Sequence, residues 1–382
     1  MVDVSVSKCN SYDSGEVRVA LREALDAIGG LDFVREGMQI AIKANLVSFM
    51  NPDAAATTHP TMLCELVSLL RERGAEVIVG DSPGGLYNAA FVGRVYKATG
   101  MHEVEKAGAH LNTDFSIGEA KFPEGRVLHD FSYTAYLDEA DAIINFCKLK
   151  THGMMGMSGA VKNLFGCVPG IMKPEYHYRF PNHADFARML VDLNEYFKPV
   201  LSICDAVVGM EGNGPTMGKP RKIGAVLASR SPYLLDLAAA SVIGLGVGDI
   251  PTLEAAVERG LAPADVADIS TNLPLAEFLV PDFKNIPAHS SIEFGKGSDR
   301  FFGKLARLFT AKALRSVPIL RSKMCVGCGV CVNICPAGAI KIEKGKAIID
   351  RNACIRCFCC QEFCPKGAMQ VGRTLIARLL TK

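Results

Sequence analysis

Apolar runs of strand length alternate with amphipathic stretches over the first 285 residues of the chain. Apolar residues recur at helical spacing in the segments 14–28, 61–73 and 233–244. The strand-length runs occupy residues 2–6, 38–44, 75–80, 142–146, 200–204 and 223–228. Apolar strands that alternate with helices are typical of a sheet covered on both faces. We therefore predict an α/β fold with a mostly parallel sheet flanked by helices.

Polar residues end or directly follow several of the predicted strands. Lys43 and Asn45 end the run at 38–44, Asp81 follows the next run, and Asp205 follows a later one. Open α/β sheets bind ligands beyond the carboxyl ends of their strands. We therefore expect a binding site at this edge of the sheet.

The segment from Lys148 to Asn163 carries the strongest candidate chemistry of the large domain. Two lysines and a histidine follow a strand, a glycine-rich loop comes next, and Lys162 lies at a predicted helix start. Glycines let backbone N–H groups face a ligand, helix N-termini favour anions, and lysines add positive charge. The loop lacks both the ending of a nucleotide-binding P-loop and the GxGxxG pattern. The alternative is a tight loop whose glycines serve packing and whose lysines are solvated.

A small anion, such as a phosphate or a carboxylate, is the expected occupant of this site. The candidate binding residues are Lys43, Asn45, Asp81, Lys148, Lys150 and Asn163, and the candidate catalytic residues are His152 and Lys162. His152 is the best candidate proton donor because it lies among lysines and glycines. A hydrogen-bonded structural histidine is the alternative.

Other polar residues have simpler explanations. Asp81, Asp205 and Glu211 could bind a divalent cation or act as acid and base. Isolated acidic residues at strand ends, however, more often cap helices or pair with lysines. We expect His59, which precedes a proline, in a turn, and His177 is a weaker candidate than His152.

Eight cysteines near the C-terminus form a duplicated pattern. Each copy reads Cys-x2-Cys-x2-Cys-x3-Cys-Pro, and the second lies 29 positions after the first. In bacterial-type two-cluster ferredoxins, the three closely spaced thiolates hold one cluster and the cysteine before proline serves the other. The predicted ligands are Cys325, Cys328, Cys331 and Cys364 for cluster one, and Cys354, Cys357, Cys360 and Cys335 for cluster two.

This pattern predicts two 4Fe–4S clusters rather than zinc or disulfides. A zinc site takes four ligands in two pairs, not two interleaved sets of four. Between the copies, two short apolar stretches flank a turn at Lys344 and Gly345, which indicates a hairpin in a small α+β domain. Cys359 lies outside the pattern, and we expect a thiol packed near a cluster, with a ligand swap as the alternative.

Composition and charge limit the class of protein and the partners that we expect. Hydrophobic residues make up 49% of the 382 residues and charged residues 21%, which is typical of a globular protein. The formal net charge of +2 hides an asymmetry, because residues 296–382 carry 17 Lys and Arg against 4 Asp and Glu. This basic region could dock an acidic redox partner, or it could simply offset the anionic clusters. It matches no nucleic-acid-binding motif, so we expect no nucleic-acid partner.

The remaining cysteines and the N-terminus indicate the cellular compartment of the protein. Five cysteines outside the ferredoxin-like region are scattered singly, as reduced thiols are. The first residues lack the basic start and apolar core of a signal peptide, and the apolar stretch at 237–248 is too short to span a bilayer. We therefore expect a cytoplasmic protein without a membrane span.

Several short motifs of the large domain resemble the family called domain of unknown function 362. They are Lys43-Ala44-Asn45-Leu46, Thr57-Thr58-His59-Pro60, Gly80-Asp81-Ser82-Pro83-Gly84, Asn145 to His152, Gly159 to Gly166, and Glu211-Gly212-Asn213-Gly214-Pro215. Ala44 departs from the family's more usual proline. Similar members often carry a fused two-cluster ferredoxin module. The resemblance implies a fold and a cluster content, but no substrate.

These observations predict three parts and leave three functions open. The parts are the α/β domain at 1–285, a connector with a basic amphipathic helix at 286–317, and a two-cluster ferredoxin domain at 318–382. The leading hypothesis is an iron–sulfur redox protein, a candidate oxidoreductase, whose large domain binds an anionic ligand or a redox partner. The alternatives are a pure electron carrier and an activation or assembly factor that delivers electrons or a cluster to another enzyme.

Overall fold

The computed structural model describes residues 1–286 and 316–373. The strands of the large domain are β1 (Val4–Lys8), β2 (Gln39–Lys43), β3 (Glu76–Gly80), β4 (His110–Leu111), β5 (Ile117–Lys121), β6 (Asp130–Thr134), β7 (Ala142–His152), β8 (Gly156–Ser158), β9 (Leu201–Glu211) and β10 (Lys219–Ser229). Its helices are α1 (Ser14–Ala27), α2 (Pro60–Arg71), α3 (Ala89–Thr99), α4 (Glu103–Lys106), α5 (Ala160–Asn163), α6 (Lys173–Arg179), α7 (His183–Phe197), α8 (Pro232–Val242) and α9 (Pro251–Glu258).

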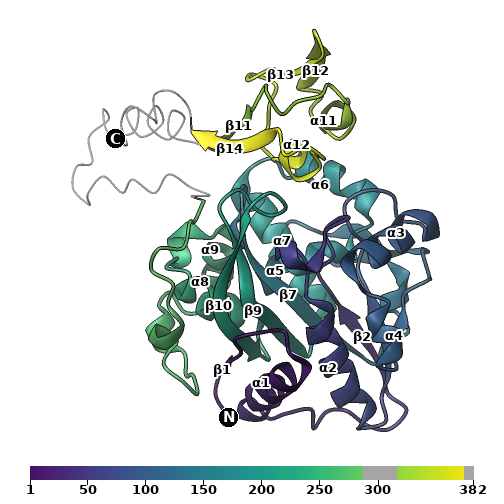
Figure 1. Ribbon diagram of the computed structural model, residues 1–382, viewed down its shortest axis with the longest axis vertical. Helices are drawn as coiled ribbons and strands as arrows, with labels where there is room; N and C mark the ends of the chain where they lie inside the picture. Colours follow the sequence, from purple (N-terminus) through teal and green to yellow (C-terminus); the bar gives the residue numbers. More distant parts are fainter. Residues whose placement is uncertain (287–315, 374–382) are drawn as a thin grey trace.

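An eight-stranded sheet organises the large domain (Figure 1). Its strand order is β1-β10-β9-β7-β2-β3-β4, and β8 pairs with β7. The pairs β2–β3, β2–β7, β3–β4 and β7–β9 are parallel, whereas β1, β8 and β10 pair with antiparallel neighbours. The predicted mostly parallel α/β sheet is confirmed.

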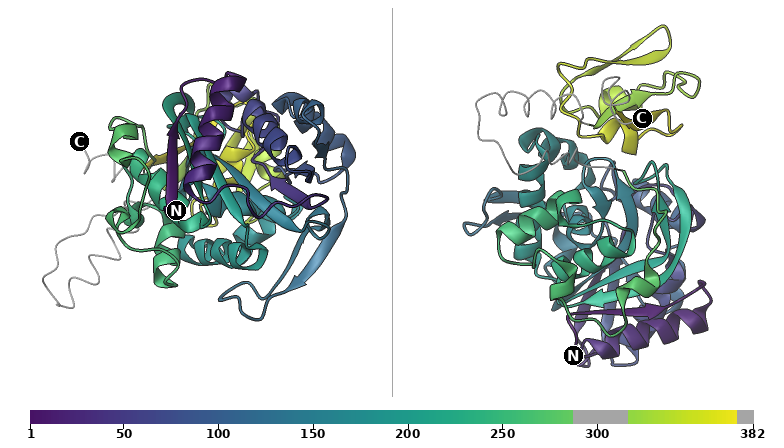
Figure 2. Two further views of the ribbon diagram at one scale, coloured as in Figure 1. Left: turned by 90° about the horizontal axis from the view of Figure 1, so that it is seen from below. Right: turned by 90° about the vertical axis from the view of Figure 1, so that its left-hand side faces the viewer.

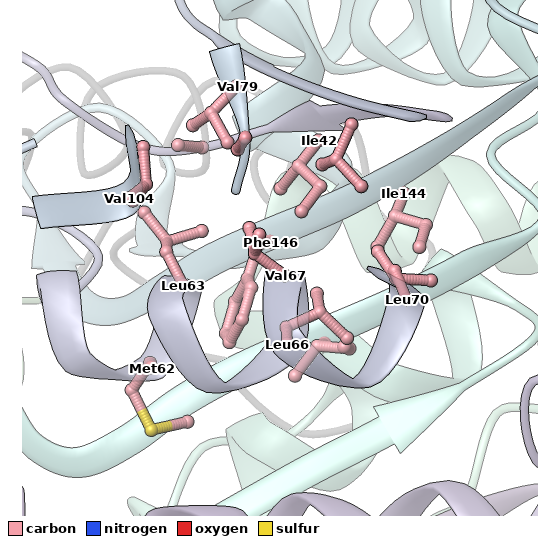
Figure 3. Packing of buried hydrophobic residues seen from close by; sticks show 14 of the residues in the cluster. Ile42, Met62, Leu63, Leu66, Val67, Leu70, Val79, Val104, Ile144 and Phe146 are labelled. Atoms are coloured by element: carbon pink, nitrogen blue, oxygen red, sulfur yellow. The ribbon is translucent and has the colours of Figure 1, made fainter. Parts of the chain in front are cut away.

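Helices α1, α2 and α3 cover one face of this sheet. The apolar residues of α2 recur at helical spacing and pack on the apolar strands (Figure 3). The residues in contact there include Leu63, Leu66, Val67 and Leu70 from the helix and Ile42, Val79, Ile144 and Phe146 from the strands. Each fully buried side chain of this kind contributes about 1.5–3 kcal/mol to folding. Helix α2 begins where His59 accepts a hydrogen bond from the Thr61 backbone, so His59 is a helix cap.

Helices α5, α7, α8 and α9 lie on the opposite face. Alternate residues of the central strands, such as Cys147, Leu149 and Cys204, pack there against α8 and α9. Because side chains alternate across a strand, the intervening residues of the same strands join the core under α1 and α2. The two cores hold the carboxyl edge of the sheet between two layers of helices.

Strands β7 and β9 are longer than the hydrophobic pattern predicts. We expected β7 to end at residue 146 and Asp205 to follow a strand, but Lys148, Lys150, His152 and Asp205 all lie within strands. The extension forms because β8 folds back on β7, which pairs Lys150 with Ser158, and because β9 continues to pair with β10. Polar residues can therefore occupy strand positions here, since pairing rather than hydrophobicity sustains the strands.

The C-terminal module is small and contains two short sheets. Strands β11 (Ser316–Leu320) and β14 (Met369–Arg373) pair antiparallel, and so do β12 (Ile340–Glu343) and β13 (Lys346–Ile349). The latter pair is the predicted hairpin. Helices α11 (Val330–Asn333) and α12 (Cys359–Glu362) follow the central cysteines of the two copies. Figure 2 shows the module above one end of the large domain. The predicted helix at 300–315 lies outside the described residues.

Candidate anion site between the two modules

A cavity of about 80 Å³ lies between the large domain and the C-terminal module. The large domain supplies most of its polar lining, which comprises Lys43, Asn45, Ser48, Asp81, Ser82, Lys150, Ser158, Lys162, Asn163, Lys173 and His177. The C-terminal module closes it with Cys359, Glu362 and Phe363. Six of the eight large-domain residues that the sequence predicts for the site therefore line one cavity, and His152 and Lys148 do not.

The floor of the cavity is a buried hydrogen-bonded network around Lys43. The Lys43 ammonium lies 2.8 Å from Asp81 Oδ1 and also donates to the Ala44 carbonyl and to Asn163 Oδ1. Asn163 Oδ1 accepts a second hydrogen bond from Asn45 Nδ2 at 2.9 Å. The charge of Lys43 is therefore already compensated within the protein.

Gly166 keeps this floor closely packed. A Cβ atom at Gly166 would collide with the Asp81 carboxylate and the Lys43 ammonium. The backbone at this point therefore approaches the ion pair as closely as only glycine permits. Close packing therefore explains the glycine at position 166, independently of any ligand.

Lys150 lies at the wall of the cavity with neutral partners only. Its ammonium donates to Asn45 Oδ1 at 2.8 Å and to the Ala56 carbonyl at 2.5 Å. Burial, followed by the charge of Lys162, lowers the pKa of Lys150 to about 7. At neutral pH this lysine can therefore release or take up a proton, and an anion beside it would favour the charged form.

Lys162 and Lys173 both lie near the ring of Phe165. Each ammonium lies 5.7 Å from the centre of that ring. Burial lowers the pKa of Lys162, and it lowers the pKa of Lys173 to about 8. No carboxylate of the described residues forms an ion pair with either lysine. These two lysines, rather than Lys43, carry the positive charge that a ligand would meet.

His152 lies beside the cavity and pairs with Glu362. Its Nδ1 accepts hydrogen bonds from the backbone N–H groups of Met154 and Met155, both at 3.1 Å. The proton of the neutral ring therefore resides on Nε2, which lies 2.7 Å from Glu362 Oε1. Burial lowers the pKa of His152 to about 4, so the ring is neutral at pH 7. This arrangement orients Glu362 and leaves His152 no free proton for a ligand.

His177 is the histidine that lines the cavity. It is 3% exposed, it stacks on Phe186, and its Nδ1 has no hydrogen-bond partner among the described residues. Burial lowers the pKa of His177 to about 3, so it is neutral. A buried ring nitrogen without a partner costs free energy unless a ligand or water satisfies it.

Lys148 belongs to a separate polar cluster. Its ammonium lies 2.9 Å from Asp205 Oδ2 and 2.7 Å from the Tyr12 hydroxyl. The Asp205 carboxylate also accepts from Tyr12 and from the His59 backbone. All these groups satisfy one another, so the prediction that Lys148 shares the site with Lys150 is not supported by the geometry.

The acidic residues considered for a metal are likewise engaged elsewhere. Asp81 pairs with Lys43, Asp205 pairs with Lys148, and Glu211 accepts from the Lys284 backbone at 3.1 Å. Within residues 1–286 and 316–373, no three His, Cys, Asp or Glu side chains converge on a single metal ion. The three acids therefore have the pairing roles that isolated acids usually have.

The helix start after the glycine-rich loop is already occupied by a carboxyl group of the protein. The backbone N–H groups of Ala160 and Val161 donate to the Asp236 carboxylate at 2.5 and 3.1 Å. Burial raises the pKa of Asp236 to about 7. The sequence predicted that these N–H groups would face a ligand. Because Asp236 comes from α8, far along the chain, no local sequence signal pointed to it.

Residues on and near α12 fasten the C-terminal module to the large domain. Gln361 Nε2 donates to the carbonyls of Asn213 and Gly214 at 3.1 and 3.0 Å. Asn213 Oδ1 in turn accepts from the Val371 backbone at 3.0 Å. The ring of Phe363 packs against Gly84, where a Cβ atom would collide with it. The glycine-rich segment around Asn213 therefore receives the second module.

Four of the eight predicted cluster ligands line one hollow. They are Cys325, Cys328, Cys331 and Cys364, and burial raises the pKa of Cys331, with the charges of the other three adding to the effect. Burial also raises the pKa of Cys360, with contributions from Cys357, Cys354, Cys335 and Cys331. None of the eight forms a disulfide. A cubane spaces its ligands more widely than one metal ion does, since each thiolate binds a different iron. The hollow holds the four thiols predicted for cluster one, and the division of the eight between two clusters stays a prediction.

Besides His177, which was ranked low, four polar or aromatic residues of the cavity were missed from the sequence. Lys173 and Ser82 reach it from loops and a short helix, whereas Glu362 and Phe363 come from a module more than 190 residues farther along the chain than Lys162. Only the position of Ser82, beside Asp81 at a strand end, was a usable signal. Glu362 and Phe363 reach the cavity only because the C-terminal module docks on the large domain.

Comparison with known proteins supports this division into modules. Residues 40–241 match the family described as domain of unknown function (DUF362), and residues 318–365 match a 4Fe-4S dicluster domain. A thylakoid-associated protein of Synechocystis sp. is 33% identical over 301 residues, which cover 76% of this chain and 90% of that protein. The lactate racemase apoprotein from Thermoanaerobacterium thermosaccharolyticum aligns at 14% identity with a TM-score of 0.41, covering 65% of this chain and 58% of the racemase.

The described helices include none with the length and apolarity of a membrane span. The dicluster domain implies two 4Fe–4S clusters, which supply single-electron transfer when bound. The DUF362 match covers more than half of the chain, and the Synechocystis match covers 76% of it. The chain therefore belongs to the DUF362 family and joins its α/β domain to an electron-transferring dicluster domain.

Proposed function

We propose that this protein is an iron–sulfur oxidoreductase that binds a small anion in the cavity between its modules. Electrons would reach the anion from cluster two. The cavity is the observation that carries this proposal, because Cys359 lies between two predicted ligands of cluster two and also lines the cavity. An electron carrier has no need to place its cluster beside a lysine-lined cavity of the same chain.

The residues around the cavity have distinct parts in this proposal. Lys162 and Lys173 would attract the anion, since no carboxylate of the described residues pairs with them. His177 Nδ1 would hydrogen-bond a polar atom of the ligand, which removes the cost of leaving that nitrogen unpaired. Lys150, with its pKa near 7, would exchange the proton that accompanies reduction or oxidation.

The two other functions predict different contents of the cavity. In a pure electron carrier, the lysines would only compensate the charge of cluster two, and no small molecule would accompany the protein. An assembly or activation factor would pass electrons or a cluster to another enzyme. The free state of all five cysteines outside the module supports a reducing compartment, and we propose the cytoplasm. The thylakoid association named for the Synechocystis relative gives a second location to examine.

The decisive experiment is to identify what the protein carries. Anaerobically purified protein is assayed for iron and sulfide, then heat-denatured, and the released small molecules are identified by mass spectrometry. The proposal expects about eight irons, for two four-iron clusters, together with one anionic molecule at near-equal amount. It expects Lys162→Met to lose that molecule and to keep its iron.

Lys97→Met is the matched control, because Lys97 is exposed on α3 and does not line the cavity. The control should retain both iron and ligand. Full iron with no released molecule in the parent protein, and no sulfate bound in a calorimetric titration, would contradict the proposal and favour the electron carrier.

A further inference from the structure

The two predicted cluster sites of the C-terminal module differ in exposure. Near cluster two, Gln361 and Glu362 contact the large domain, and Cys359 is 2% exposed. Near cluster one, the loop that carries Cys325 and Cys328 contains exposed side chains, and Cys328 itself is exposed. An electron from outside can therefore enter most directly at cluster one.

The surface around Cys328 combines apolar and basic side chains. Val326 is 61% exposed, and Met324 and Val330 are also exposed. The exposed basic residues near them are Arg321, Lys323, Lys344, Lys346 and Lys366. We call these eight residues the cluster-one face.

The contacts within the module place these residues around the same loop. Lys346 donates to the Cys325 carbonyl at 2.6 Å, and the turn at Gly345 packs on Gly327. Lys366 lines the same hollow as Cys325 and Cys328. Residues from three separate parts of the module therefore contribute to one surface.

The charge of this surface is not balanced by neighbouring acids. Residues 316–373 contain nine Lys and Arg and three Asp and Glu. Of the three acids, Glu343 pairs with Lys341 at 2.6 Å, and Glu362 faces His152 inside the cavity. The lysines of the cluster-one face are consequently available to an external partner.

We propose that the cluster-one face docks an acidic single-electron carrier protein, which supplies the electrons of the cavity reaction. The reduced carrier loses one electron and cluster one gains it, with no bond made or broken. The exposed apolar residues would exclude water from the centre of the contact, while the lysines meet acidic residues at its rim. The proposal is separate from the cavity ligand, since docking could fail while the ligand still binds.

The test measures electron entry and direct binding. Reduced flavodoxin, an acidic flavin protein, is mixed anaerobically with the oxidised protein, and the loss of visible cluster absorbance gives a second-order rate constant. Methyl viologen radical, a small cationic reductant, serves as the reference donor. Electrostatic steering predicts that the flavodoxin rate falls steeply with ionic strength and that the viologen rate does not.

Charge reversal locates the docking surface. Lys323→Glu/Lys344→Glu should slow reduction by flavodoxin about tenfold or more at low salt and leave the viologen rate unchanged. The control Lys97→Glu/Lys121→Glu reverses two exposed lysines of the large domain and should leave both rates unchanged. If the first variant loses iron, the milder Lys323→Gln/Lys344→Gln replaces it.

Binding without electron transfer provides the second readout. Oxidised flavodoxin should bind the parent protein in calorimetry at low salt and bind the Lys323→Glu/Lys344→Glu variant more weakly. A flavodoxin rate that is flat in salt, or equal losses in the control variant, would overturn the proposal. So would a face that binds vesicles containing phosphatidylserine, or a short DNA duplex, but not flavodoxin.

Discussion

The buried Lys43–Asp81 pair allows a sharp test of how the cavity floor is stabilised. Lys43 is fully buried, Asp81 is 4% exposed, and their charged atoms lie 2.8 Å apart. Asp81→Asn keeps the shape of the side chain and removes its charge. The buried ammonium then has only neutral acceptors, including the Ala44 carbonyl and Asn163 Oδ1. Breaking one partner of such a pair typically costs about 3–5 kcal/mol.

This cost should appear as a lower melting temperature. For a domain of this size each kcal/mol lowers Tm by about 2–4 °C, so Asp81→Asn should melt roughly 6–20 °C lower. Because the chain has no tryptophan, unfolding is followed by far-ultraviolet circular dichroism. The double variant Lys43→Met/Asp81→Asn removes both charges, and it should recover most of the loss.

The two variants together distinguish a structural ion pair from a ligand-binding lysine. A strong loss in Asp81→Asn with recovery in the double variant means that Lys43 compensates Asp81. If Asp81→Asn melts within about 2 °C of the parent, the Lys43 charge is compensated by another group. In that case Asp81 is not the main counter-ion of Lys43, and our description of the floor is wrong.

Three further predictions concern the clusters, the module contact and pH. Cys364→Ser should lose about half of the iron, for one four-iron cluster of the two, whereas Cys359→Ser should keep all of it, as measured by iron and sulfide analysis; equal losses would make Cys359 a ligand. Gln361→Ala removes two hydrogen bonds to the large domain, so hydrogen exchange at residues 212–216 should quicken while iron content stays constant. Protonated Lys150 is the form that an anion favours, so sulfate affinity should fall as pH rises above about 7, approaching tenfold per unit, in calorimetry from pH 6 to 9; a constant affinity would remove Lys150 from the site.

The cluster-binding module is the part of the chain that sequence reasoning described most completely. Cysteine spacing alone divided eight thiols into two interleaved sets, and the four thiols predicted for cluster one line one hollow in the structure. The reason is that a cubane requires its ligands in a short, fixed arrangement, so the geometry is encoded within about 40 residues. The hairpin between the copies followed from equally local signals.

The α/β sheet was also predictable, because hydrophobic periodicity reports which residues face a core. The ends of β7 and β9 were not predictable, because pairing with neighbouring strands extends both strands through polar residues. This extension separates two lysines that the sequence had placed in one site. Lys148 and Lys150 are two residues apart, yet one pairs with Asp205 and the other with Asn45.

The sequence by itself determined the cofactors, the family and the kinds of residue that meet at the carboxyl edge of the sheet. Only the tertiary structure decided which charges remain free. Asp81 and Asp236 satisfy groups that we expected to face a ligand, while Glu362 closes the cavity from the other module. These partners are distant in the chain, and charge compensation in a buried site depends on distances of a few ångströms. Local sequence patterns do not encode such distances, so only the folded structure determines them.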